Sequence, residues 1–90
     1  MNQEGTKVVD VRSKEEFLSG HFPGAVNIPL PELTQHLPEF RKMKGEIVVC
    51  CASGVRSAKA CQLLKRENIF SVRDGGSWLG LQKEILDHQN

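Results

Sequence analysis

The sequence has no block of charge of one sign and no long apolar run. Twelve basic and eleven acidic residues are mixed along the chain and give a formal charge of +1, so no basic stretch can follow a phosphate backbone. The longest apolar run covers residues 47–52, which is too short for a signal core or a membrane span, and the N-terminus is polar. We therefore expect no nucleic-acid partner, no membrane partner and a cytoplasmic location.

Cysteines are few, and their arrangement excludes two common roles. Cys50, Cys51 and Cys61 are odd in number and match neither a disulfide framework nor a metal-binding pair. The three histidines also lack the spacing that would place them in a metal site with a cysteine. The pattern is typical of reduced thiols in a reducing compartment, and it predicts no metal ion.

Repeats, low-complexity tracts and linkers are absent as well. The 39% of apolar and 26% of charged residues are typical of a globular protein. We interpret residues 1–90 as a single domain and expect a monomer. A chain of this length buries only about 60–65% of its unfolded surface, so its stability margin is narrow.

Short β-branched runs alternate with helical patterns along the chain. The sequence predicts strands at residues 7–11, 25–28, 46–50 and 70–73. It predicts a helix at residues 13–20, started by a capping box of Ser13 and Glu16. It also predicts helices at 32–43 with a break at Pro38, at 57–67 and at 78–88. Gly75 and Gly76 are interpreted as a turn between the last strand and the last helix. This alternation predicts an α/β fold with a parallel sheet covered by helices.

Cys51 opens the loop that joins the predicted strand 46–50 to the helix that follows it. In α/β folds the ligand crevice lies at the carboxyl ends of the parallel strands. Backbone N–H groups ahead of a helix, together with the helix dipole, favour anions and thiolates there. Gly54 supplies freedom for a tight curl, and Arg56 supplies a planar guanidinium suited to an oxyanion. The loop therefore predicts a nucleophilic cysteine whose pKa is lowered.

The other loop and cysteine residues have simpler interpretations. Ser57 is a natural N-cap for the predicted helix. Cys61 lies on the apolar face of that helix and Cys50 ends a buried strand, so both are predicted to be core thiols without chemistry.

Three segments of the chain resemble the rhodanese family and stand in the family's order. They are VVDVRSKEEFLSGHFPGAVNIP, VVCCASGVRSAKACQLL and VRDGGSW. The resemblance covers nearly the whole chain and implies a small parallel sheet of four to five strands with helices on both faces. It also implies that Cys51 is the catalytic nucleophile and that Arg56 binds the anion. The substrate-binding loop would comprise Ala52, Ser53, Gly54, Val55, Arg56 and Ser57.

Two further segments of the resemblance imply structural support for this loop. Asp10 and Arg12 lie at the end of the first predicted strand, and His21 lies in the predicted turn 20–24, which also contains Pro23 and Gly24. We expect Asp10, Arg12 and His21 to brace the site rather than to take part in the reaction.

The resemblance implies a sulfurtransferase that needs no metal or organic cofactor. Its Cys51 thiolate would take sulfur from a donor such as thiosulfate and hold it as a persulfide. Cyanide or a thiol, including a protein thiol, would then accept the sulfur.

Two alternatives stay open at this point. A cysteine phosphatase also closes a loop from a cysteine to an arginine, and five residues separate Cys50 from Arg56, as in the longer phosphatase loop. The count from Cys51 is four, and it places Gly54 third after the cysteine, which favours sulfur transfer. The other alternative is a persulfide carrier or regulatory module without useful turnover.

Overall fold

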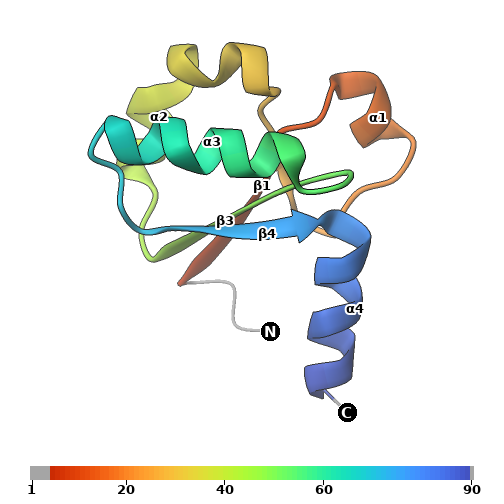
Figure 1. The fold of residues 1–90 in the computed structure, drawn as a ribbon. Helices are drawn as coiled ribbons and strands as arrows, with labels where there is room; N and C mark the ends of the chain where they lie inside the picture. Colours follow the sequence, from red (N-terminus) through yellow and green to blue (C-terminus); the bar gives the residue numbers. More distant parts are fainter. Residues whose placement is uncertain (1–4, 90) are drawn as a thin grey trace.

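Within residues 5–89, which the computed structural model describes, four parallel strands form one sheet. The strands are β1 (Thr6–Asp10), β2 (Val26–Asn27), β3 (Glu46–Cys51) and β4 (Val72–Ser77), in the order β2-β1-β3-β4. The chain thus runs outward in one direction from β1 and in the other from β3 (Figure 1). In parallel sheets with such a reversal, ligands bind at the carboxyl ends of the strands on either side of it, here β1 and β3.

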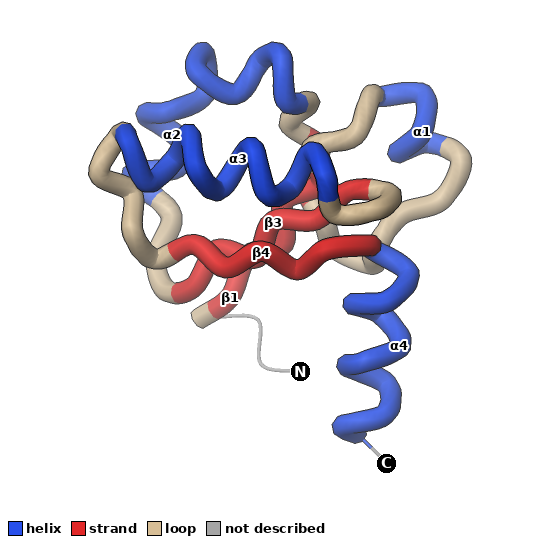
Figure 2. Tube along the Cα trace, in the orientation of Figure 1, coloured by secondary structure: helices blue, strands red, loops and turns tan. Residues whose placement is uncertain are grey.

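The helices lie on both sides of the sheet, as Figure 2 shows. They are α1 (Lys14–Leu18), the 3-10 helix η1 (Leu30–His36), α2 (Leu37–Lys42), α3 (Val55–Arg66) and α4 (Trp78–Gln89). The helices η1, α2 and α3 pack on one face, and α4 packs on the other. The predicted α/β class and the parallel sheet with helices on both faces are confirmed. In the described part of the chain, none of these helices is long and apolar enough to cross a membrane.

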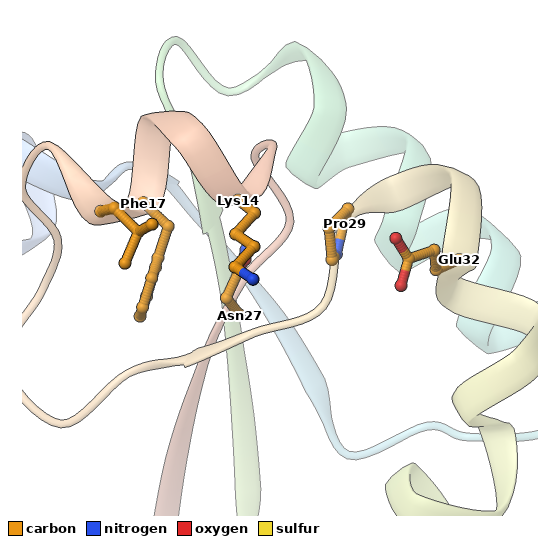
Figure 3. A pocket seen from close by; sticks show the side chains of 6 residues that line it. Lys14, Phe17, Asn27, Pro29 and Glu32 are labelled. Carbon is orange, nitrogen blue, oxygen red and sulfur yellow. The ribbon is translucent and has the colours of Figure 1, made fainter.

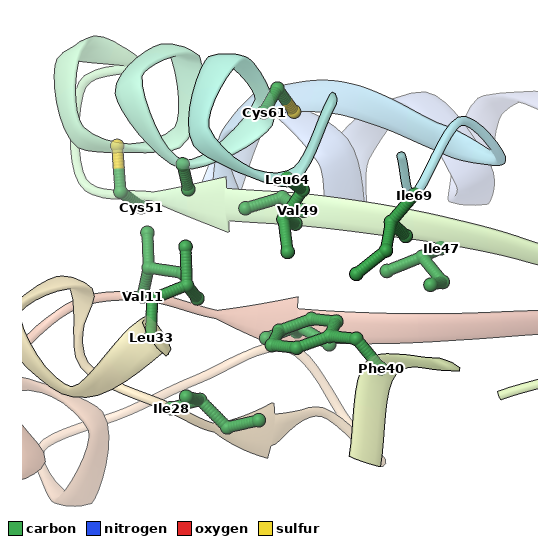
Figure 4. Close-up of a cluster of buried hydrophobic side chains, with 12 residues drawn as sticks. Val11, Ile28, Leu33, Phe40, Ile47, Val49, Cys51, Cys61, Leu64 and Ile69 are labelled. Carbon is green, nitrogen blue, oxygen red and sulfur yellow. The ribbon is translucent and has the colours of Figure 1, made fainter. Parts of the chain in front are cut away.

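Successive residues of β3 face opposite cores because side chains alternate along a strand. Ile47, Val49 and Cys51 point into the larger core under α3 (Figure 4), whereas Val48 and Cys50 point into the smaller core under α4. Both faces of β3 are buried, which explains its unbroken apolar sequence. The larger core also holds Phe40, Leu33, Ile28 and Leu64, each at most 2% exposed. Burying one such side chain stabilises the fold by about 1.5–3 kcal/mol as an upper estimate.

The prediction for the last strand was wrong. The strand predicted at 70–73 is β4 at Val72–Ser77, so it runs through the glycine pair that was interpreted as a turn. A bulge between Val49 and Cys50 lets β4 stay paired with β3. At Gly75 a Cβ atom would lie 2.8 Å from Cγ1 of Val48, so glycine is needed for close approach of the strands. The pairing between strands overrode the local turn signal.

The helical connection after β2 also differs in detail from its prediction. It begins at Leu30 rather than Glu32, and the change from η1 to α2 falls between His36 and Leu37. Pro38 lies in the first turn of α2, where its missing N–H has no intrahelical partner to lose. The proline therefore starts a helix here and does not break one.

Candidate active site

The cysteine loop is shorter than predicted, because both neighbouring elements extend into it. Cys51 is the last residue of β3 and pairs with Ser77 of β4, and α3 begins at Val55. Only residues 52–54 lie between the strand and the helix. Gly54 is the N-cap, with φ of 100°, a left-handed conformation that glycine adopts without a steric penalty.

Ser57 is not the N-cap of α3, so that prediction was wrong. It lies within the first turn and is fully buried. Its hydroxyl is 3.1 Å from the carbonyl oxygen of Gly54 and 2.6 Å from Oδ1 of Asp74. Asp74 also accepts a hydrogen bond of 2.9 Å from the Gly76 amide. The serine therefore joins the loop to β4 instead of starting the helix.

The sulfur of Cys51 is surrounded by hydrogen-bond donors. The Gly54 amide donates to Sγ at 2.9 Å and the Ser57 amide donates at 3.4 Å. Burial raises the pKa of the Cys51 thiol, but hydrogen bonding from the amide and hydroxyl of Ser57 and from the Gly54 and Ser53 amides outweighs it. The net effect is a lowered pKa. Figure 4 shows this sulfur pointing toward the start of α3.

The two other thiols have the opposite electrostatics. Burial, followed by the nearby charge of Asp10, raises the pKa of Cys50 to about 12. Burial also raises the pKa of Cys61 to about 11. Both side chains are core residues, as predicted. Their raised pKa values favour the neutral thiol at neutral pH.

Arg56 lies in the first turn of α3, but its guanidinium is engaged by a carboxylate. Its Nη1 donates to Oε1 of Glu16 at 2.7 Å and its Nη2 donates to Oε2 at 3.0 Å. This hydrogen bond and those from Ser13 lower the pKa of Glu16 to about 2. The ion pair ties α1 to α3 across the carboxyl end of the sheet.

A second ion pair, between Asp10 and Arg12, is buried in the protein. Three hydrogen bonds of 2.8–3.0 Å join the guanidinium of Arg12 to the carboxylate of Asp10, and both residues are buried. Arg12 also donates to the carbonyl oxygen of Gly20 at 2.7 Å, and its guanidinium carbon lies 5.1 Å from the ring centroid of Trp78. The pair therefore connects β1 with the turn after α1 and with α4.

His21 lies farther along the same turn. Its Nδ1 is 2.8 Å from the carbonyl oxygen of Phe17, and the two rings stack with centroids 3.7 Å apart. These contacts stabilise the end of α1. That Asp10, Arg12 and His21 support the site stays a prediction.

Sequence reasoning missed two side chains that contact the loop. Glu16 was recognised only as part of the capping box with Ser13, which the structure contains. Asp74 was passed over as the residue before a turn. Asp74 lies in the middle of β4, paired with Val49, and it reaches the loop only through the Ser57 hydroxyl, which no local sequence pattern indicates.

A cavity of about 350 Å³ lies between α1 and η1 (Figure 3). Its lining residues are Lys14, Phe17, Leu18, Asn27, Pro29 and Glu32, none of which belongs to the cysteine loop. Among the described residues, no group of three or more histidine, cysteine or acidic side chains is placed to hold a metal ion.

Comparison with known proteins identifies the family. A family model described as Rhodanese-like domain matches residues 1–82. The chain belongs to this family. Thiosulfate sulfurtransferase 16 of Arabidopsis thaliana, a chloroplast protein, is 32% identical in an 81-position alignment that covers 78% of this chain and 68% of that protein.

Solved structures of rhodanese-like proteins have the same fold. Rhodanese with anions from E. coli superposes with a TM-score of 0.77 at 26% identity, covering 84% of this chain and 91% of that one. The human single-domain sulfurtransferase TSTD1 superposes with a TM-score of 0.69 at 28% identity, covering 94% and 84%. The matched part of this rhodanese-like chain spans 38% of YrkF and 56% of YqhL, two relatives from Bacillus subtilis.

Proposed function

We propose that this rhodanese-like chain is a sulfurtransferase that carries sulfane sulfur as a persulfide on Cys51. The observation that carries the proposal is that the Gly54 and Ser57 amides donate to Sγ of Cys51 at 2.9 and 3.4 Å. These bonds lower the pKa of Cys51, whereas burial raises those of Cys50 and Cys61. A thiolate is the reactive form of cysteine. Relatives named as sulfurtransferases support this assignment.

The proposed reaction has two balanced steps. The Cys51 thiolate attacks the outer sulfur of thiosulfate, the sulfur–sulfur bond of the donor breaks, and sulfite leaves with the bonding electron pair. Cyanide or a thiolate then attacks the outer sulfur of the persulfide, which restores the Cys51 thiolate. The amides of Gly54 and Ser57, which contact Sγ, would stabilise negative charge on either form of the residue.

Access to the sulfur is part of this proposal. Cys51 has no exposed surface in the structure. A donor therefore reaches it only after local movement, and the short turn at residues 52–54 is the element best placed to move, since Ala52 and Ser53 are exposed. The physiological donor and acceptor would be selected at this opening.

Mass spectrometry of the protein after incubation with thiosulfate tests the assignment. We expect a gain of about 32 Da, one sulfur atom, on the peptide between Lys44 and Arg56. That peptide contains both Cys50 and Cys51, so the two cysteines are separated by the variants Cys50→Ala and Cys51→Ala. The gain should persist in Cys50→Ala and disappear in Cys51→Ala. If the mass gain disappeared in a folded Cys50→Ala variant and persisted in Cys51→Ala, Cys50 and not Cys51 would be the nucleophile.

Turnover assays separate the proposal from its two alternatives. An aryl phosphate should be a poor substrate, because a turn of only residues 52–54 leaves little room to surround a phosphate group. A phosphatase rate that exceeds sulfur transfer and needs Cys51 would overturn the sulfurtransferase assignment. A persulfide that forms but is not transferred to cyanide or a thiol would instead favour a carrier.

A further inference from the structure

The Glu16–Arg56 pair limits the charge available to a donor at Cys51. Arg56 is the cation expected to hold an anionic donor, yet two of its N–H groups are bonded end-on to both oxygens of Glu16. Both side chains are a little more than one-third exposed, so the pair lies at the surface of the site and not in the core.

Glu16 is held in place independently of Arg56. Its Oε1 accepts hydrogen bonds from the amide of Ser13 at 3.1 Å and from the hydroxyl of Ser13 at 3.0 Å. Its own amide donates back to that hydroxyl at 3.2 Å. This capping box fixes the carboxylate at the start of α1, so it meets Arg56 without needing a bound ligand to order it.

The other charged side chains named at the site do not supply the positive charge that Glu16 neutralises on Arg56. Arg12 is neutralised by Asp10. Asp74 contacts Ser57 and adds a negative charge on the β4 side of the loop. The side chains named here are negative at Asp10, Glu16, Asp74 and the Cys51 thiolate and positive at Arg12 and Arg56. A dianion such as thiosulfate therefore approaches this group of charges at a cost.

We propose that Glu16 is a specificity-determining residue that disfavours dianionic sulfur donors and favours donors of lower charge, namely small thiol persulfides. This inference rests on the proposed sulfurtransferase function. In the favoured reaction the Cys51 thiolate attacks the outer sulfur of R–S–SH. The donor's sulfur–sulfur bond breaks, the thiolate R–S⁻ leaves with the electron pair, and Cys51 keeps the sulfur as a persulfide.

The substitution Glu16→Gln tests this role with little change in shape. Glutamine at this position still completes a capping box with Ser13, but it leaves the charge of Arg56 unpaired. Glu15→Gln is the matched control, because Glu15 lies in the same turn of α1, is exposed, and forms no ion pair with any residue in the described range 5–89. Both variants change the net charge by the same amount.

The readout is the ratio of kcat/KM for thiosulfate to kcat/KM for hydroxyethyl persulfide, a donor with an uncharged chain. In Glu16→Gln we expect the ratio to rise about tenfold, the size of one charge-assisted contact. In Glu15→Gln it should change less than about twofold, since an exposed charge is screened. Adding Arg56→Gln to Glu16→Gln should remove the gain. A ratio that stays constant or falls in folded Glu16→Gln would overturn the proposal and make Glu16 a residue that orients Arg56 for dianions.

A measurement on the unchanged protein keeps the proposal testable if the variant does not fold. Sulfate, a dianion, should protect Cys51 from alkylation only weakly, with an apparent Kd no better than about 10 mM. Tight protection by sulfate would contradict the proposal. Failure of the sulfurtransferase function itself is a different result: neither donor would add sulfur to Cys51 in the folded wild type.

Discussion

Cys50 and Cys51 are neighbours in sequence and are both fully buried, yet they lie in opposite environments. Cys50 faces the smaller core, near the carboxylate of Asp10, and its pKa is raised to about 12. Cys51 faces the start of α3, and its sulfur accepts hydrogen bonds from Gly54 and Ser57. Burial alone therefore does not determine the state of a thiol. The alternation of side chains along β3 places only one of the two cysteines among backbone donors.

Removing each cysteine in turn should give the largest effect. Cys51→Ala should lower sulfur transfer by more than about 10³-fold, because the covalent step is lost. Cys50→Ala deletes a buried sulfur from the smaller core and should keep activity within a few-fold, with some loss of stability. A coupled assay with thiosulfate and cyanide, together with thermal unfolding, checks both variants. If both variants folded and lost activity equally, the claim that only Cys51 is reactive would be contradicted.

This contrast was partly predictable from the sequence. The unbroken apolar run that ends in two cysteines predicted a buried strand, and Gly54 third after Cys51 identified the residue at the turn. Glu16 was visible as a capping residue, but its contact with Arg56 joins residues 40 positions apart in sequence. Local sequence patterns do not show which distant residues contact each other, so the Glu16–Arg56 pair could be seen only in the folded structure.

The end of the sheet shows the same limit of local patterns. Gly75 and Gly76 predicted a turn, and Ser57 predicted a helix cap, because these residue types favour turns and caps in isolation. In the fold, the two glycines belong to β4, which pairs with β3, and the Ser57 hydroxyl donates a hydrogen bond to Asp74. Both errors arise where β4 meets the cysteine loop, which is where packing between distant segments decides the local structure.

Removing the Ser57 hydroxyl should reduce the reactivity of Cys51 by less than the cysteine substitutions do. Ser57→Ala removes a hydroxyl that helps to lower the pKa of Cys51, so that pKa should rise and alkylation at neutral pH should slow. Ser53→Ala is the matched control, because Ser53 acts through its backbone amide, which the substitution keeps. Iodoacetamide kinetics compare the two variants. An equal slowing in both would assign the effect to the loop in general.

The smallest effect on Cys51 reactivity is expected from substitutions that alter packing on the Cys50 face of the sheet. These should change the stability of the fold instead. Gly75→Ala places a Cβ atom 2.8 Å from Val48 Cγ1 and 3.2 Å from the Val49 carbonyl oxygen, so we expect a loss of about 1–3 kcal/mol in the free energy of unfolding. Gly80→Ala, in α4, meets nothing closer than 3.8 Å and should gain about 0.5–1 kcal/mol. Denaturant unfolding measures both. A neutral Gly75→Ala would mean that β4 lies less closely against β3.

The pH dependence of alkylation at Cys51 is the most direct test of the account. It is measured in a variant with Cys50→Ala and Cys61→Ala, so that one thiol reports. Hydrogen bonds to Sγ favour the thiolate, so the folded-state pKa lies below that of the unfolded chain, and reactivity should persist as the pH falls below the usual cysteine value. We predict a midpoint below about 8.5, which shifts upward to that value in denaturant. A midpoint at or above about 8.5 in the folded protein would contradict the claim that the loop activates Cys51.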